Sequence, residues 1–251
     1  MKKINQLIQQ WERGTVRISS YLNKAGYQKD LMKKYVSSKW LESLGYGAFK
    51  LAGDTIEWTG AVKALQEQKG LGIHPGGISA IELRGYGHYI KQGGEVIHLF
   101  GNRKETLPKW FTNQNWMNRI NYVKTSLFNY KSNSLTSTVS VNNLKVKVSI
   151  NELAAMEMLF LVPKVQSFEE AYLVMENLTS LRPKYVQQLL EECNSIKVKR
   201  LFMWMAEKQN HSWVEDLDLS KINFGNGKRL IVKNGALDKK YNITIPREFN
   251  G

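Results

Sequence analysis

The fold of this chain is decided by residues 19–51, which read SSYLNKAGYQKDLMKKYVSSKWLESLGYGAFKL. The pattern predicts a short helix over residues 20–25 and a longer one over residues 28–39, whose apolar positions recur at helical spacing. Gly26 lies between them and suits the left-handed conformation in which a chain leaves a helix. Two helices joined by a tight turn are therefore expected here.

Two strands are expected next, over residues 40–44 and 48–51, because the intervening Gly45-Tyr46-Gly47 suits a tight hairpin. Upstream, residues 2–12 carry apolar side chains at helical spacing, and Gly14 ends that helix. The resulting order of helix, helix, turn, helix and hairpin is that of a winged helix-turn-helix.

Positive charge is concentrated in the same part of the chain. Residues 1–52 hold ten basic side chains against three acidic ones, a net +7 out of +14 for all 251 residues. The sequence pI is about 9.7. A compact basic head of this kind favours a polyanion, and the helical pattern favours DNA.

The DNA-binding side chains are expected on the helix over residues 28–39, on the hairpin and at the start of the short helix. Lysines neutralise phosphates, hydroxyls add hydrogen bonds, and a helix N-terminus attracts a phosphate. Ser19 and Ser20 are also helix-capping residue types. A charged helix face is by itself usually only solvated, and the surrounding order of elements favours DNA. The predicted contacts are Ser19, Ser20, Lys29, Lys33, Lys34, Ser37, Ser38, Tyr46 and Lys50.

The remainder of the chain predicts an α+β protein with strands first and helices after. A DNA-binding domain of residues 1–95, with a winged core over 1–53 and a helical extension, precedes a mixed α/β domain of residues 96–251. Helices are expected at 58–69 and 78–83, strands at 96–100, 119–125 and 144–149, a loop at 131–143, helices at 150–162, 167–178, 183–193 and 197–209, and strand signals in the tail after 228.

Enzyme chemistry is not favoured. Asp216 and Asp218 form a spaced carboxylate pair of the kind that holds two metal ions for nucleotidyl transfer, but no Gly-Ser phosphate loop occurs in the sequence. The four histidines lack metal-ligand spacing, and the lone Cys193 forms no internal disulfide and favours a reducing compartment. No apolar run is long enough to span a bilayer. We expect a cytoplasmic protein without metal, cofactor or membrane contact, and not an enzyme.

A second polyanion surface is the alternative interpretation of the basic C-terminal half. The helix over 197–209 is expected to be basic on one side and aromatic on the other. Together with other cations it would bind RNA, although a solvated basic exterior is the simpler interpretation. The further cations are Lys145, Lys147, Lys228, Arg229, Lys233, Lys239 and Lys240.

A resemblance to a known family covers nearly the whole length. The chain resembles AbiEi-type antitoxins, the regulator half of bacterial AbiE abortive-infection operons, which are type IV toxin–antitoxin systems active in phage defence. The stretches that carry the resemblance are Trp40–Phe49, Ala52-Gly53-Asp54, Trp58, Gly60-Ala61, His74-Pro75-Gly76-Gly77, Ala80–Leu83, Gly85-Tyr86, Leu161–Lys164, Gln166–Ala171, Leu181–Lys184, Val198–Phe202 and Pro246-Arg247-Glu248. The chain departs from the family pattern at Gln28 and Val36, where a capping and a basic residue are expected.

The resemblance implies two activities. The N-terminal winged helix would bind inverted repeats in the promoter of its own operon and repress it. The C-terminal domain would counteract a toxin of the nucleotidyltransferase class without a stable complex. The competing functions are an RNA-binding module that shields the toxin's RNA target and a metal-dependent nucleotidyl-transfer enzyme that uses Asp216 and Asp218.

Overall fold

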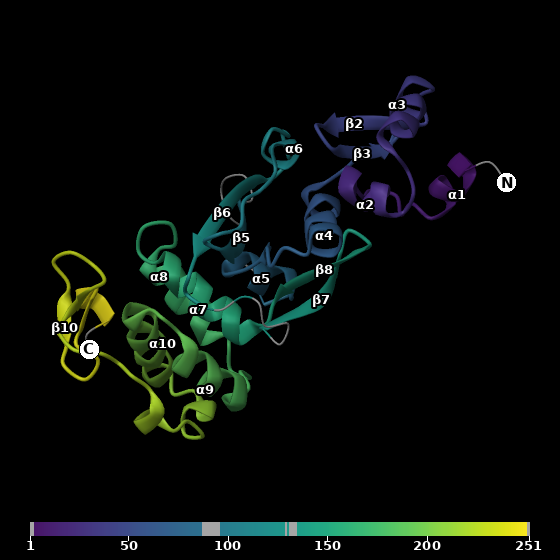
Figure 1. The fold of residues 1–251 in the computed structure, drawn as a ribbon. Helices are drawn as coiled ribbons and strands as arrows, with labels where there is room; N and C mark the ends of the chain where they lie inside the picture. Colours follow the sequence, from purple (N-terminus) through teal and green to yellow (C-terminus); the bar gives the residue numbers. More distant parts are fainter. Residues whose placement is uncertain (1–2, 87–95, 129, 131–134, 250–251) are drawn as a thin grey trace. The chain divides into compact units, whose positions relative to one another are not determined.

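The computed structural model describes residues 3–86, 96–128, 130 and 135–249. The chain forms two compact units (Figure 1). The first consists of the described residues of Met1–His74, Gln92–Lys124 and Thr138–Lys147, and the second of those of Pro75–Lys91, Thr125–Ser137 and Val148–Gly251.

The first unit begins with the expected winged helix-turn-helix, so that prediction is confirmed. Its three strands form one sheet in the order β1-β3-β2, with antiparallel pairs throughout. The elements are α1 (Lys3–Gln9), β1 (Arg17–Ile18), α2 (Ser19–Lys24), α3 (Lys29–Ser37), β2 (Leu41–Gly45) and β3 (Ala48–Leu51).

The start of α2 differs from the prediction. The helix begins at Ser19, its cap position is Ile18, and no side chain caps it. The predicted serine cap is therefore wrong, because the extended strand β1 leads directly into the helix. The backbone N–H of Ser19 instead donates to the carbonyl of Gly47 at 2.9 Å. Strand β1 was not predicted, since two residues are too few to show an alternating pattern.

Apolar side chains from every helix of the head meet in one core. Met32 brings α3 into it and is 2% exposed. Leu31, Tyr35 and Val36 pack partly against the same cluster, which leaves the lysines of α3 outside. The buried cluster is Ile4, Leu7, Trp11, Leu22, Tyr27, Met32, Leu41 and Leu51.

Helix α4 (Trp58–Lys69) packs against the head at close range, as its predicted apolar face requires. A Cβ atom added to Gly60 would lie 1.8 Å from the carbonyl oxygen of Gly14, so only glycine allows this approach. Gly70 ends the helix in the left-handed conformation, at φ +64°.

Two further groups of strands follow. β4 (His74–Pro75), β5 (Val96–Asn102) and β6 (Arg119–Thr125) form a sheet in the order β4-β5-β6, and α6 (Lys109–Thr112) lies between β5 and β6 in the chain. β7 (Thr136–Val141) pairs with β8 (Leu144–Ser149). The predicted loop over 131–143 is therefore wrong at 136–141, and residues 131–134 lie outside the described residues. Asn142 and Asn143 have φ of 49° and 63°, which suits a two-residue hairpin turn that the Ser/Thr-rich composition concealed.

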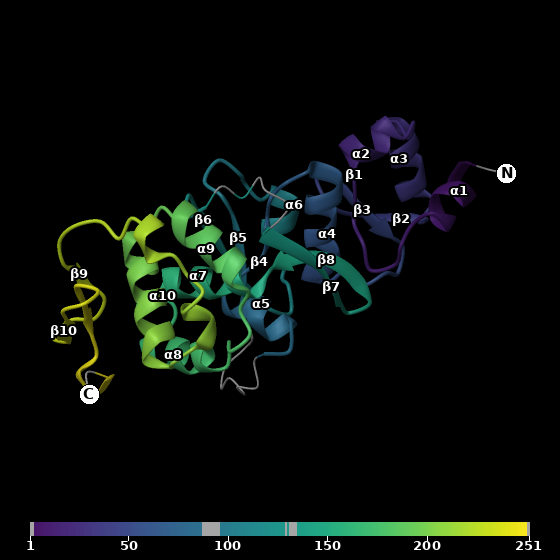
Figure 2. The same ribbon diagram turned by 90° about the horizontal axis from the view of Figure 1, so that it is seen from below.

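The second unit is mainly helical, and its predicted helices are confirmed. Ser167 caps α8 by accepting from the N–H of Glu170, and Pro183 begins α9. Helix α7 contacts α5, α8, α9 and α10, so it lies at the centre of this unit (Figures 1 and 2). The elements are α5 (Ile78–Leu83), α7 (Asn151–Leu161), α8 (Phe168–Glu176), α9 (Pro183–Glu192), α10 (Ile196–Lys208) and a small sheet of β9 (Arg229–Leu230), β10 (Ala236–Asp238) and β11 (Ile243–Ile245).

The α+β class, with a winged head and a helical C-terminal half, is thus the observed architecture. The predicted domain boundary after residue 95 falls outside the described residues and stays a prediction.

Candidate DNA-binding surface

A groove of about 790 Å³ runs between α3 and the β2–β3 hairpin, which forms the wing. It brings together five of the nine predicted DNA-binding residues. Three come from α3, one from the start of α2 and one from the tip of the wing: Lys29, Lys33, Ser37, Ser19 and Tyr46. The other residues that line it are Asn23, Met32, Val36, Ser43, Gly45, Gly47 and Phe49.

The wing presents its tip to solvent. Gly45 and Gly47 have φ of +133° and +82°, values that favour glycine, and they place Tyr46 between them at 93% exposure. An aromatic side chain left this exposed at a turn is available to a ligand.

The remaining four predicted residues do not line the groove. Ser20, Lys34 and Ser38 are exposed elsewhere on α2 and α3, and Ser38 lies at the C-cap of α3 rather than inside the helix. The fourth, Lys50, has protein partners.

Lys50 is engaged at the base of the wing. Its Nζ lies 2.8 Å from a carboxylate oxygen of Glu42 and donates to the carbonyl of Asp54 at 2.6 Å. The bond from Lys50 and a second one from the N–H of Gly53 lower the pKa of Glu42. These contacts join β2, β3 and the turn that follows, so Lys50 has a structural role here.

The lysines of α3 have few competing partners. The Nζ of Lys33 lies 3.6 Å from a carboxylate oxygen of Asp30, and both side chains are more than two-thirds exposed. An exposed pair at this distance is weak and gives way easily to a stronger anion. The hydroxyl of Ser37 donates to the carbonyl of Lys34 at 3.0 Å, which leaves its oxygen free to accept.

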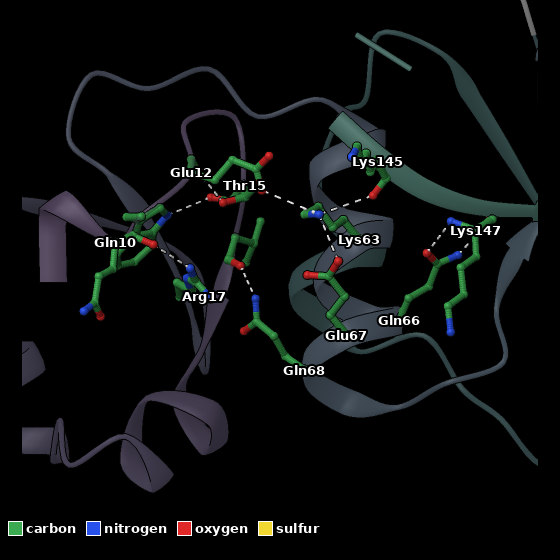
Figure 3. Close-up of polar contacts among 12 residues, drawn as sticks. Gln10, Glu12, Thr15, Arg17, Lys63, Gln66, Glu67, Gln68, Lys145 and Lys147 are labelled. Atoms are coloured by element: carbon green, nitrogen blue, oxygen red, sulfur yellow. Dashed lines mark hydrogen bonds and ion pairs between the residues drawn. The ribbon is translucent and has the colours of Figure 1, made fainter. Parts of the chain in front are cut away.

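Helix α4 braces the strand that leads into α2, through side-chain amides (Figure 3). Gln68 accepts from the N–H of Ile18 at 2.8 Å and donates to the carbonyl of Val16 at 2.6 Å. Gln66 makes the same double contact with the backbone N–H and carbonyl of Lys147 on β8, both at 2.9 Å. Two side-chain amides of α4 thus bind the backbone of two strands, and no sequence pattern predicts these contacts because each partner is a backbone group.

A second brace supports the wing from α6. The Cβ of Trp110 lies 3.3 Å from the position of a Cβ on Gly45, and Gln114 donates to the carbonyl of Leu44 at 2.6 Å. Sequence reasoning missed these contacts, since the partners are 65 and 70 residues apart in the chain.

The prediction that α10 exposes a basic face is wrong. Lys199 and Arg200 are only 4% and 3% exposed, and both bind backbone carbonyls of the segment around residues 223–227. Lys197 donates to the carbonyls of Phe160 and Val162, and burial lowers its pKa to about 8. These cations hold the chain together instead of facing a polyanion or solvent, because the carbonyls of neighbouring turns satisfy them.

Asp218 and the cysteine also have structural surroundings, whereas Asp216 is exposed. Asp218 accepts from the N–H and hydroxyl of Ser220 and pairs with Lys221 at 3.0 Å, and these bonds lower its pKa. Cys193 is buried, which raises its pKa to about 11. In the described part of the chain, no group of three or more His, Cys, Asp or Glu side chains is placed to hold a metal ion. No helix in that part is both long and apolar enough to cross a membrane.

Comparison with known proteins adds to this picture. A solved structure with a similar fold is the RV2827C protein from Mycobacterium tuberculosis, which is 11% identical with a TM-score of 0.62 over 96% of this chain and 88% of that one. No curated protein matches the chain. Residues 1–92 match the family described as "Transcriptional regulator, AbiEi antitoxin N-terminal domain", and residues 94–246 match "Transcriptional regulator, AbiEi antitoxin, Type IV TA system". With both matches spanning nearly its full length, the chain belongs to the AbiEi antitoxins, the transcriptional regulators of type IV toxin–antitoxin systems.

Proposed function

We propose that this regulator binds double-stranded DNA with α3 in the major groove and the wing on the adjoining backbone. The observation that supports this most directly is the groove itself, which gathers Lys29, Lys33, Ser37 and Tyr46. Two lysines supply phosphate contacts, and the serine supplies a hydrogen-bonding oxygen. Tyr46 lies at the tip of the wing, where it can pack against the sugar-phosphate backbone.

The target we propose is the promoter of the protein's own operon, where two copies would occupy inverted repeats and repress transcription. A trihelical head reads one half-site, so an inverted repeat takes two chains. They can arrive as monomers or as a preformed dimer.

A salt titration of binding tests the DNA proposal. Full-length protein is titrated onto the duplex upstream of its gene and onto a shuffled duplex of equal composition. We expect specific binding to the native duplex, with an affinity that falls steeply as salt rises. Equal, weak binding to both duplexes would refute the proposal.

Two double variants assign the contacts. Lys29→Ala with Lys33→Ala is expected to reduce the log–log salt slope by about two, at about 0.9 per phosphate contact. Lys145→Ala with Lys147→Ala is a matched control, because both lysines are exposed on β8 in the same compact unit. If the salt slope fell as much for the control variant as for Lys29→Ala/Lys33→Ala, the total charge of the protein, and not the groove, would determine DNA binding.

We further propose that the chain is not an enzyme and that it counteracts a toxin of the nucleotidyltransferase class in the cytoplasm, without a stable complex with that toxin. The full-length Lys29→Ala/Lys33→Ala variant is expected to lose repression while still protecting cells that express the toxin. Loss of protection by this variant, when well folded, would refute the separation of antitoxicity from DNA binding. Co-purification of a stoichiometric toxin complex with the native chain would refute the absence of a stable complex.

A further inference from the structure

One aliphatic side chain of α3, Val36, lies at the border between the buried face of the helix, which holds Met32, and the polar face that the helix turns to the groove. Lys29, Lys33, Val36 and Ser37 line the groove, and their spacing of four, three and one places them on one face of the helix. Three of the four are polar or charged. Val36 offers a ligand neither a donor nor an acceptor.

The surroundings of Val36 make it a fixed apolar contact. It is half-buried and packs partly against the core of the head, while it also lines the groove. Valine is branched at Cβ and keeps one strongly preferred rotamer in a helix. A methyl group presented in this way is ordered before any ligand arrives, so binding it costs little side-chain entropy.

The neighbours define what can face Val36. Lys33 lies one turn before it and Ser37 directly follows it, both exposed, whereas Met32 and Phe49 add apolar surface to the groove. A base edge that reaches past Lys33 towards Met32 and Phe49 would therefore meet an apolar spot at Val36. In the major groove of DNA, the one apolar group on a base edge is the 5-methyl of thymine.

We propose that Val36 reads thymine, through contact between its methyl groups and a thymine 5-methyl within each half-site of the operator. This inference rests on the proposed DNA binding by α3. It assigns to Val36 a part in specificity, while the lysines on the same face supply affinity that is independent of sequence.

Replacing thymine by deoxyuridine tests the contact, because it removes the methyl group and leaves the base pair intact. The upstream duplex is prepared with deoxyuridine at one thymine at a time, and affinities are compared at one fixed salt concentration. Burial of one methyl corresponds to about a fourfold change in affinity. For the native protein we expect a loss of about fourfold at one or two positions per half-site and no loss elsewhere.

The variants connect that loss to Val36. Val36→Ala should bind the thymine and deoxyuridine duplexes equally, since its own contact is gone. Val165→Ala is a matched control, because Val165 is an exposed valine in the other compact unit, and it should retain the full discrimination. Val36→Thr keeps the shape of the side chain and one methyl group, and should retain part of the discrimination.

Each outcome decides the question. Equal binding of the native protein to all duplexes, or undiminished discrimination by Val36→Ala, would overturn the inference while leaving DNA binding in place. Absence of specific binding by the native protein would instead refute the proposed function. If Val36→Ala does not fold, the native protein and Val36→Thr still decide it.

Discussion

Gln68 completes the outer edge of strand β1 by accepting from the N–H of Ile18 at 2.8 Å and donating to the carbonyl of Val16 at 2.6 Å. β1 has β3 on its other side. An amide that binds one N–H and one carbonyl of a strand imitates a neighbouring strand. Helix α4 therefore ties down the strand that leads into α2, one residue before the helix begins.

Removing this amide should destabilise the head. Gln68→Ala leaves a partly buried N–H and carbonyl without their partner, which costs about 1–3 kcal/mol of unfolding free energy. Urea denaturation of the full chain measures it. Gln9→Ala is a matched control on an exposed position of α1 and should change stability by less than about 0.5 kcal/mol. Equal stability of the two variants would show that water replaces the amide without cost.

Lys50 should behave as a structural lysine in DNA binding. Its contacts with Glu42 and Asp54 persist only if its charge stays at the base of the wing. Lys50→Met is therefore expected to change the salt slope of DNA binding by much less than one, in contrast to Lys33→Met. A slope reduced by about 0.9 would instead show that Lys50 neutralises a phosphate.

Acid should destabilise the wing through Glu42. The lowered pKa of Glu42 means that its contribution is present above the unfolded-state pKa and is lost as the pH falls through the folded-state pKa. In Glu42→Gln this part of the pH dependence should be absent. Unfolding free energies of both proteins between pH 3 and 7 measure the difference, and parallel curves would contradict the assignment.

Glu152 is a buried carboxylate of the second unit that forms an ion pair with Arg182. Glu152 is 2% exposed and accepts two guanidinium bonds at 2.8 and 3.0 Å and the N–H of Arg182 at 2.9 Å. Burial alone would raise the pKa of Glu152, and the bonds from Arg182 lower it overall. Arg182→Ala should cost about 1–3 kcal/mol, less than for a fully buried pair because the arginine side chain is half exposed.

Arg182→Ala should also change how the free energy of unfolding depends on pH in the acidic range. Without Arg182 the pKa of Glu152 rises, so the carboxylate takes up a proton at a higher pH, and the variant has no favourable ion pair to lose in acid. Lys184→Ala, in the first turn of α9 and two residues after Arg182, is the control. Identical pH profiles for Arg182→Ala and Lys184→Ala would count against the ion pair.

Because of Lys197, the free energy of unfolding of the native protein should rise with pH in the alkaline range. Burial, and secondarily Lys164, lower its pKa to about 8 from an ordinary value near 10.4. Between these values the unfolded chain binds the proton more tightly, so stability increases with pH. Relative to Lys197→Met, the native protein should gain stability from pH 8 to pH 10. A constant difference between the two would show that the amine stays protonated in the fold.

Much of the architecture could be predicted because it depends on local patterns. Helical spacing in α3 and α4, the glycines around Tyr46, the serine before α8 and the proline at α9 act within a few residues, so the sequence displays them directly. The same reasoning located α3 and the wing as the candidate surface and predicted the lysines on it. Strand β7 was missed, and with it the hairpin to the predicted strand β8, because the Ser and Thr residues of β7 resemble the composition of a loop.

What the sequence by itself determined, then, was the order of elements, the basic head and the family. Only the tertiary structure decided which cations face an open surface and which are held by buried or structural partners. The sequence does not distinguish an exposed cation from one with buried partners. In the structure Lys29 and Lys33 line an open groove, whereas Lys50 contacts a carboxylate and Arg200 donates to four carbonyl oxygens. The physical reason is that a cation's role depends on the acceptors within about 3 Å, and those acceptors come from backbone and side chains that the fold alone brings near.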